Sequence, residues 1–178
     1  MPHTTARTEL CTDRLRLRWL TEDDAELLLS LWNDPDFIRY VGDRGIRTLE
    51  ESRQAMRDGV LQLYVDFGYG AYLVEALDGG PPMGICGLFK RENLDHPDIG
   101  YGLLPGFRGR GYALEAASAV LTHARDYMGI PQLKAIVSQA NKGSVRLLEK
   151  LGMQAEGAIR MPGDDEDVVL YGIEFHKK

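Results

Sequence analysis

The chain has 178 residues, of which 44% are hydrophobic and 27% are charged; this composition is typical of a globular protein and excludes an intrinsically disordered one. The formal net charge is −6, and no basic stripe interleaved with aromatic side chains points to a nucleic-acid partner. Residues 1–8 have no apolar core of signal-peptide length and no later run could span a bilayer, so we expect a cytoplasmic protein without a membrane partner. The two cysteines, Cys11 and Cys86, predict neither a disulfide framework nor a metal site.

The length and the absence of linkers or low-complexity tracts predict a single domain over residues 1–178, with residues 1–8 flexible. Residues 164–167 form an acidic run after Pro162-Gly163. We interpret this run as a solvated hairpin turn rather than as a metal site. The sequence therefore predicts no metal centre.

In the first half of the chain, alternating apolar and polar residues and apolar runs between turn residues predict three strands. Thr21, with Asp24 three residues later, is expected to begin a helix that ends at residues 33–35, and a second helix is expected to end at Gly59. The second and third strands flank a turn at residues 78–82 and should form an antiparallel hairpin. The expected strands cover residues 15–20, 70–77 and 83–90, and the second helix covers residues 49–58.

The second half of the chain predicts a strand that ends at Pro105-Gly106, a long helix with one buried face, and a further strand. The connection between the two strands is long enough for a right-handed crossover, so the strands should be parallel neighbours. A short helix followed by Gly152 and a final hairpin complete the pattern. The expected strands cover residues 98–104, 133–138, 153–161 and 167–175, and the expected helices cover residues 111–128 and 144–151.

The junction LLPGFRGRGYALEAASAVL (residues 103–121) is cationic and rich in glycine although the chain is acidic. Main-chain N–H groups at the start of a helix lack intrahelical acceptors, and together with the positive end of the helix dipole they form an anion site. Arg108 and Arg110 add charge, while Gly109 and Gly111 let a phosphate approach the main chain. We interpret residues 108–113, the glycine–arginine loop, as a phosphate or pyrophosphate site. An ordinary strand-to-helix turn with solvated arginines is the alternative.

Two familiar phosphate motifs do not fit this loop. The sequence has no Gly-Lys-Ser/Thr, which a Walker-type loop requires, and Leu114 stands where a dinucleotide-binding fingerprint has its third glycine or alanine. ATP hydrolysis and NAD-dependent redox chemistry are therefore not predicted.

Three segments resemble motifs of the GNAT superfamily of acetyl-CoA-dependent N-acetyltransferases. The glycine–arginine loop is similar to the family signature Gln/Arg-x-x-Gly-x-Gly/Ala. The segment NKGSVRLLEKLGM (residues 141–153) is similar to the motif Asn-x-x-Ser-x-x-x-x-Glu-Lys-x-Gly-Phe, with Met153 in place of phenylalanine. Residues 13–41 resemble the opening of the ribosomal-protein alanine acetyltransferase-like branch. Together the resemblance covers most of residues 13–175.

The resemblance implies an α/β (α+β) GNAT fold, with a mixed, mostly antiparallel sheet of six to seven strands and about four helices. The sheet would be splayed between its two central parallel strands, and the pantetheine arm of acetyl-CoA would lie in that gap. Main-chain groups near Leu103 would pair with the pantetheine amides, and the amides of residues 109–113 would hold the pyrophosphate. The implied cofactor-binding residues are Leu103, Leu104, Arg108, Gly109, Arg110, Gly111, Tyr112, Ala113 and Asn141.

Acetyl transfer to an amine needs a neutral nucleophile and a proton for the departing thiolate. Asp98 matches the acidic residue that the family has at the start of the central strand, and it is the candidate base, acting directly or through water; a solvated carboxylate is the alternative. Ser144 matches a serine that the family places near the cofactor sulfur, and it is the candidate general acid; a helix N-cap is the alternative. Asn141 has the alternative role of starting the helix that follows it. Cys86 is interpreted as inert core, which favours direct transfer over a covalent carrier.

We therefore predict an enzyme that transfers an acetyl group from acetyl-CoA to a primary amine, on a protein N-terminus or a small molecule, by direct attack in a ternary complex. The acceptor pocket is expected near residues 37–45 and 64–69. His96 is interpreted as a solvated loop side chain, and Tyr101 and Tyr112 as packing residues. A non-catalytic acyl-CoA-binding or sensing domain is the alternative function. A monomer or homodimer is expected, without metal or nucleic acid.

Overall fold

The computed structural model describes residues 8–176, so the predicted flexibility of residues 1–8 concerns, apart from Thr8, residues outside this range. The described range holds eight strands, six α-helices and two short 3-10 helices. The strands are β1 (Leu10–Cys11), β2 (Leu15–Trp19), β3 (Ala71–Ala76), β4 (Gly84–Phe89), β5 (Asp98–Leu103), β6 (Gln132–Val137), β7 (Gln154–Arg160) and β8 (Asp167–Glu174). The helices are η1 (Glu22–Asp24), α1 (Ala25–Trp32), α2 (Pro35–Tyr40), α3 (Leu49–Asp58), α4 (Val60–Phe67), η2 (Pro105–Phe107), α5 (Tyr112–Asp126) and α6 (Lys142–Lys150).

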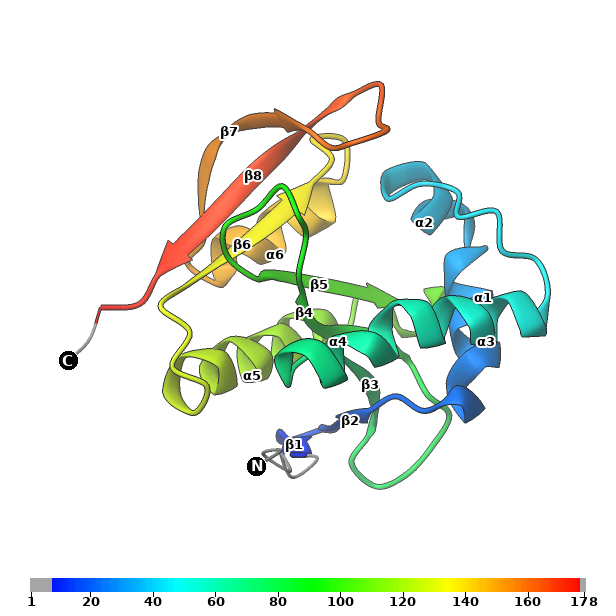
Figure 1. Cartoon of the computed structure of the whole chain (residues 1–178). Coiled ribbons are helices and arrows are strands. Elements are labelled where there is room, and N and C mark those ends of the chain that lie inside the picture. The colour runs from blue at the N-terminus through cyan, green and yellow to red at the C-terminus, as the bar shows by residue number, and fades with distance from the viewer. Residues whose placement is uncertain (1–7, 177–178) are drawn as a thin grey trace.

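The eight strands form one sheet in the order β1-β2-β3-β4-β5-β6-β8-β7. Neighbouring strands are antiparallel except β5 and β6, which are parallel. This confirms the predicted mixed, mostly antiparallel sheet. The expected six to seven strands become eight because the two residues of β1 pair with β2 ahead of the first predicted strand. Figure 1 shows α1, α2 and α3 gathered at one side of the molecule and β6, β7 and β8 at the other.

The α-helices outnumber the four that were expected because two were not predicted. Asp34 and Pro35 follow the end of α1, as expected, but they also begin α2. The Asp34 carboxylate accepts a hydrogen bond from the main-chain N–H of Phe37 (3.1 Å), and Pro35 is the first helical residue, where its missing N–H costs nothing. Gly59 ends α3, as predicted, and α4 begins at the next residue.

Helices cover the sheet on both faces. On one face α5 packs on β2, β4 and β5 in a cluster that includes Val120. On the other face α1 and α3 pack in a cluster that includes Leu28 and Met56. Successive residues of β4 alternate between the faces, with Ile85 in the α1 cluster and Cys86 in the α5 cluster. The sheet therefore lies between two apolar layers.

The parallel strands β5 and β6 are paired at one end only. Asp98 is paired with Lys134, and the N–H of Lys134 donates to the carbonyl of Pro97 (3.0 Å). Past Asp98 no further register pair joins the two strands, and Figure 1 shows β6 turning away from β5. The predicted divergence of the central parallel strands is confirmed, and it leaves one edge of β5 without a strand partner.

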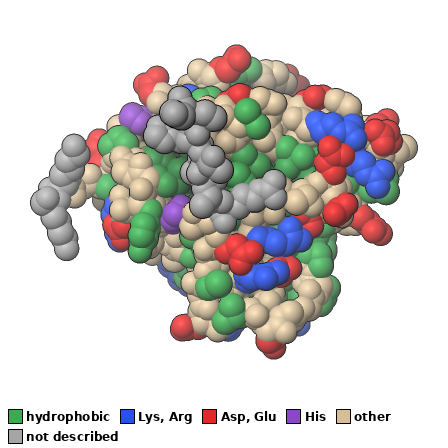
Figure 2. Space-filling model, turned by 60° about the horizontal axis from the view of Figure 1, so that its bottom comes forward, with side chains coloured by type: hydrophobic (Ala, Val, Ile, Leu, Met, Phe, Trp, Pro, Cys, Tyr) green, Lys and Arg blue, Asp and Glu red, His purple; other side chains and the backbone are tan. Residues whose placement is uncertain are grey.

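The surface mixes charges of both signs. On the face drawn in Figure 2, basic and acidic side chains lie beside one another, with hydrophobic side chains between these groups. Surface ion pairs include Arg57 with Glu22 (2.9 Å) and Arg160 with Asp167 (3.0 Å). Within residues 8–176, no helix combines the length and the apolar character needed to cross a membrane.

Candidate active site

A cleft of about 1130 Å³ opens where β5 and β6 diverge, and we call it the central cleft. Residues of α2 and of the loop after it line one side, and residues of β6, α6 and the β7–β8 turn line the other. Most of the predicted site residues line it: Asp98, Leu103, Arg108, Gly109, Gly111, Tyr112, Ala113, Asn141 and Ser144. Leu104 and Arg110 are outside the lining. The N–H of Leu104 donates to the carbonyl of Met83 (2.8 Å), which extends the contact with β4.

The glycine–arginine loop presents main-chain N–H groups at one end of the central cleft. Within the described part of the chain, the N–H groups of residues 109–113 have no hydrogen-bond acceptor. Gly109 and Gly111 have φ angles of 74° and 80°, a left-handed conformation that favours glycine. Successive free N–H groups at the positive end of a helix form a concave anion site. This end of the cleft can hold a phosphate or a pyrophosphate.

Arg108 is engaged in contacts that its predicted role did not include. Its guanidinium donates to the carboxylates of Asp34 (2.6 Å) and Asp36 (2.8 Å), and its Nε donates to the carbonyl of Leu103 (2.9 Å). Burial alone would raise the pKa of Asp34, but the hydrogen bond from Arg108 and one from the main chain lower it. Arg108 thus joins the loop to α2 and its charge is already balanced, whereas Arg110 is exposed and makes no ion pair among the described residues.

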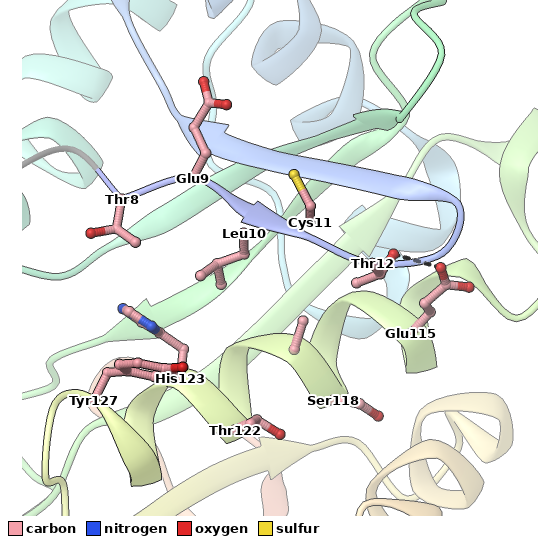
Figure 3. A pocket seen from close by; sticks show the side chains of 11 residues that line it. Thr8, Glu9, Leu10, Cys11, Thr12, Glu115, Ser118, Thr122, His123 and Tyr127 are labelled. Carbon is pink, nitrogen blue, oxygen red and sulfur yellow. Dashed lines mark hydrogen bonds between the residues drawn. The ribbon is translucent and has the colours of Figure 1, made fainter.

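The β1–β2 turn braces the glycine–arginine loop through Glu115, in the first turn of α5. Glu115 accepts hydrogen bonds from the Thr12 hydroxyl (2.6 Å) and from Arg14 Nε (2.7 Å); Figure 3 shows the first of these beside a smaller hollow between β1 and α5. Arg14 also donates to the carbonyl of Arg110 (3.1 Å) and lies over the ring of Tyr112 (4.4 Å). The sequence does not predict this brace, because its members are about a hundred residues apart.

Asp98 lies at the opposite end of β5 from the loop, and it is only 1% exposed. Its Oδ2 accepts a hydrogen bond from Arg91 Nε (3.0 Å), whereas its Oδ1 has no partner among the described residues. Burial raises the pKa of Asp98, and the positive charge of Arg91 opposes that rise without cancelling it. The alternative of a solvated carboxylate is therefore wrong. A buried carboxylate with a free oxygen and a raised pKa has the properties of a general base.

Ser144 faces the cleft from the first turn of α6, and its Oγ lies 2.6 Å from the Tyr101 hydroxyl. The alternative role of Ser144 as an N-cap is wrong, because Asn141 caps α6 and its side-chain oxygen accepts the N–H of Ser144 (3.2 Å). Burial raises the pKa of Tyr101 to about 12. Tyr101 therefore remains protonated at neutral pH and can donate to Ser144. The sequence predicts Tyr101 only as a packing residue and does not predict this pair.

The remaining candidates lie outside the central cleft. Cys86 is fully buried, and that burial raises the pKa of its thiol, as expected for inert core. His96 lies 2.6 Å from the side chain of Gln132 and does not line the cleft. Residues 37–45 contribute to the lining as predicted, but residues 64–69 do not, because α4 turns Val60 and Leu63 to the cleft instead.

Comparisons with known proteins agree with this geometry. The family model described as an acetyltransferase (GNAT) domain matches residues 14–154. Two relatives come from Bacillus subtilis (strain 168): the uncharacterized protein YkkB, 34% identical over 87% of this chain and 90% of its own, and the uncharacterized N-acetyltransferase YoaA, 29% identical over 91% and 94%. A similar fold occurs in RimL, a ribosomal L7/L12 α-N-protein acetyltransferase solved with coenzyme A; its TM-score is 0.80 at 21% identity, with 94% of this chain and 98% of that chain covered.

Proposed function

The chain belongs to the GNAT acetyltransferase family, whose general reaction is acetyl transfer from acetyl-CoA to an amine, and on this premise we propose how its residues divide that reaction. Acetyl-CoA supplies the activated acetyl thioester. The observation that carries the proposal is the row of free N–H groups at residues 109–113, at the opposite end of β5 from a buried carboxylate with a free oxygen. Such a row suits a pyrophosphate, and the carboxylate suits an amine that must lose a proton.

In the proposal, the glycine–arginine loop and Asn141 hold the cofactor, with the pantetheine arm along the free edge of β5 near Leu103. Leu104 and Arg108 act indirectly: Leu104 fixes the end of β5 on β4, and Arg108 fixes the loop on α2. Arg110 is the loop cation that is available for a phosphate. Tyr112 and Ala113 contribute main-chain N–H groups.

Asp98 takes a proton from the attacking amine through its free Oδ1, directly or through water. Ser144 gives its hydroxyl proton to the departing sulfur, and the Tyr101 hydroxyl at 2.6 Å is placed to donate to Ser144 as it does so. One proton is taken up and one is given for each acetyl transferred, and solvent restores both groups. The new N–C bond and the broken C–S bond belong to a single direct transfer, because the thiol of Cys86 is buried away from the cleft.

The proposal also covers the compartment, the oligomeric state, the acceptor class, the partners and the domain organisation. The protein acts in the cytoplasm as a monomer or homodimer, on a protein N-terminus or a small-molecule amine. It uses neither a metal ion nor nucleic acid. The whole chain, residues 1–178, acts as one GNAT domain.

The test is a screen of primary amines with acetyl-CoA, read by release of free CoA. We expect turnover with at least one class of amine, and no turnover with the same amines when Gly111→Asp replaces the parent chain. Coenzyme A binding without turnover across the whole panel would contradict the proposal and favour a non-catalytic acyl-CoA-binding domain.

A further inference from the structure

Two arginines from distant segments line the Asp98 end of the central cleft. Arg44 comes from the loop between α2 and α3, and Arg91 follows β4. The guanidinium of Arg44 lies over the ring of Trp32, with 4.7 Å between Cζ and the ring centroid. Trp32 is itself a buried residue that lines the cleft. This cation–π contact keeps the positive charge of Arg44 at the cleft wall.

Arg44 has no carboxylate partner among the described residues, and the same holds for Arg146, which lines the cleft from α6. Arg108 is paired with Asp34 and Asp36, and Arg91 with Asp98. Asp43, the residue before Arg44, is paired with Arg47. Glu92 and Asp164 also line the cleft, and neither makes an ion pair with Arg44. Its charge is thus uncompensated in a chain whose net charge is −6.

The surroundings of Arg44 disfavour its charge in the absence of an anion. Although the residue as a whole is exposed, packing of the cleft wall around its guanidinium lowers the pKa of Arg44, and the nearby positive charge of Arg91 lowers it further. Two like charges that face one cavity are stabilised when an anion binds between or beside them. The Nε of Arg91 is used by Asp98, and its two terminal nitrogens make no hydrogen bond within residues 8–176.

We propose that Arg44, together with the free nitrogens of Arg91, binds a carboxylate of the acceptor while the acceptor amine reaches Asp98. This inference rests on the proposed function and names its substrate class: a primary amine that carries a carboxylate, such as a free amino acid or a peptide with an acidic residue next to its N-terminus. A planar guanidinium recognises a carboxylate through two parallel N–H···O bonds, which gives direction as well as charge.

The test compares acceptors that differ only in that carboxylate. Free amino acids are measured against their carboxamides, which tests recognition of an α-carboxylate. C-terminally amidated Ala-Glu is measured against amidated Ala-Gln, which tests recognition of a side-chain carboxylate. We expect kcat/KM to be at least about tenfold higher for the carboxylate member of one of these pairs, which corresponds to one net charge-assisted hydrogen bond. Arg44→Gln should remove that preference by raising KM for the carboxylate acceptor, while the carboxamide is acetylated as before.

Two further variants make the result specific to Arg44. Arg44→Lys keeps the positive charge but loses the planar guanidinium that can make two parallel hydrogen bonds to a carboxylate. The preference for the carboxylate acceptor should therefore fall only in part. Arg53→Gln removes one positive charge from α3, outside the lining of the cleft, and should leave the preference as in the parent. Equal kcat/KM values for both members of every pair would overturn the inference and leave the acetyltransferase activity standing.

A binding measurement keeps the inference testable if the screen finds no turnover. N-acetyl amino acids and their carboxamides are titrated calorimetrically into the protein saturated with coenzyme A. We expect tighter binding of the carboxylate form and loss of that difference in Arg44→Gln. Equal binding of both forms would overturn the inference, whereas absent turnover alone would count against the proposed function.

Discussion

At one end of the central cleft, the consecutive residues 109–113 offer free main-chain N–H groups; at the other end, Asp98, Arg91 and Arg44 reach the cleft from three separate segments. The first end depends on the main chain of one loop, so its geometry is local and depends on glycine. The second end depends on charged side chains from distant segments: Arg91 is paired with Asp98, whereas Arg44 has no carboxylate partner among the described residues. We therefore expect changes at the first end to abolish cofactor binding and changes at the second to alter the reaction with the cofactor still bound.

Gly111→Asp should have the largest effect. The carboxylate would add a negative charge where a pyrophosphate is expected, and an aspartate is strained at a φ of 80°. Loss of two or more charge-assisted hydrogen bonds lowers coenzyme A affinity by at least about a hundredfold, measured by calorimetry. Gly79→Asp is the matched control, because Gly79 has a similar φ of 89° in an open turn away from the cleft and should bind coenzyme A normally. Normal affinity in a folded Gly111→Asp variant would contradict the loop assignment.

Asp98→Asn should leave coenzyme A affinity unchanged and lower turnover by about a hundredfold or more, the usual contribution of a general base. Because burial raises the pKa of Asp98, the acidic limb of the kcat/KM profile should lie above the ordinary aspartate range, and it should vanish in the variant. Asp95→Asn removes an exposed carboxylate three residues earlier and serves as the control. Turnover of Asp98→Asn within a few-fold of the parent would rule out this base.

The raised pKa of Asp98 also predicts how the free energy of unfolding changes with pH. A raised folded-state pKa means that the folded protein binds more protons than the unfolded chain between the two pKa values, so the free energy of unfolding falls as pH rises through that window. In Asp98→Asn the side chain does not titrate, so the free energy of unfolding does not fall in this way as pH rises. Denaturant unfolding of parent and variant should therefore show the variant gaining relative stability from pH 4 upward, a pH close to the unfolded aspartate pKa of about 3.9.

Ser144→Ala should depress the plateau of the pH–rate profile by about a hundredfold, the lower end for loss of a general acid, while the acidic limb stays in place. The fold should be unaffected because Asn141, not Ser144, caps α6, and the N–H of residue 144 keeps its acceptor. Ser118→Ala, on α5 beside the smaller hollow, should behave as the parent. A shifted acidic limb with an unchanged plateau would contradict the assignment of Ser144 as the acid.

The contrast between the two ends explains how much the sequence could predict. The glycine–arginine loop was predicted because glycines, arginines and a following helix are adjacent in the chain, and their geometry is local. Asp98 was found through its match to the acidic residue that the family has at the start of the central strand. Its burial was not predicted, because its partner Arg91 and the strands around it are joined only in the fold. The short helix α2 was missed because Asp34-Pro35 signals the end of one helix and the start of another equally well. Arg44 gives no sequence signal, since its lack of a carboxylate partner within residues 8–176 depends on how distant segments meet at the cleft.

Arg108→Gln should have the smallest effect on the reaction and a measurable effect on stability. The change removes the cationic partner of Asp34, whose side chain is 5% exposed and keeps only main-chain donors such as the N–H of Phe37, and losing a hydrogen bond to a charged group costs about 1.5–3 kcal/mol. Because the folded-state pKa of Asp34 is lowered, its pairing stabilises the protein above the unfolded aspartate pKa, and this contribution is lost as pH falls through the folded value. The variant should therefore lose stability at pH 7 and lose little at low pH, with a few-fold rise in KM for acetyl-CoA from the loosened loop.

Arg110→Gln is the matched comparison: Arg110 makes no ion pair within the described residues, so unfolding should match the parent while KM for acetyl-CoA still rises. If both variants unfold as the parent does, Arg108 is not what fixes the loop on α2.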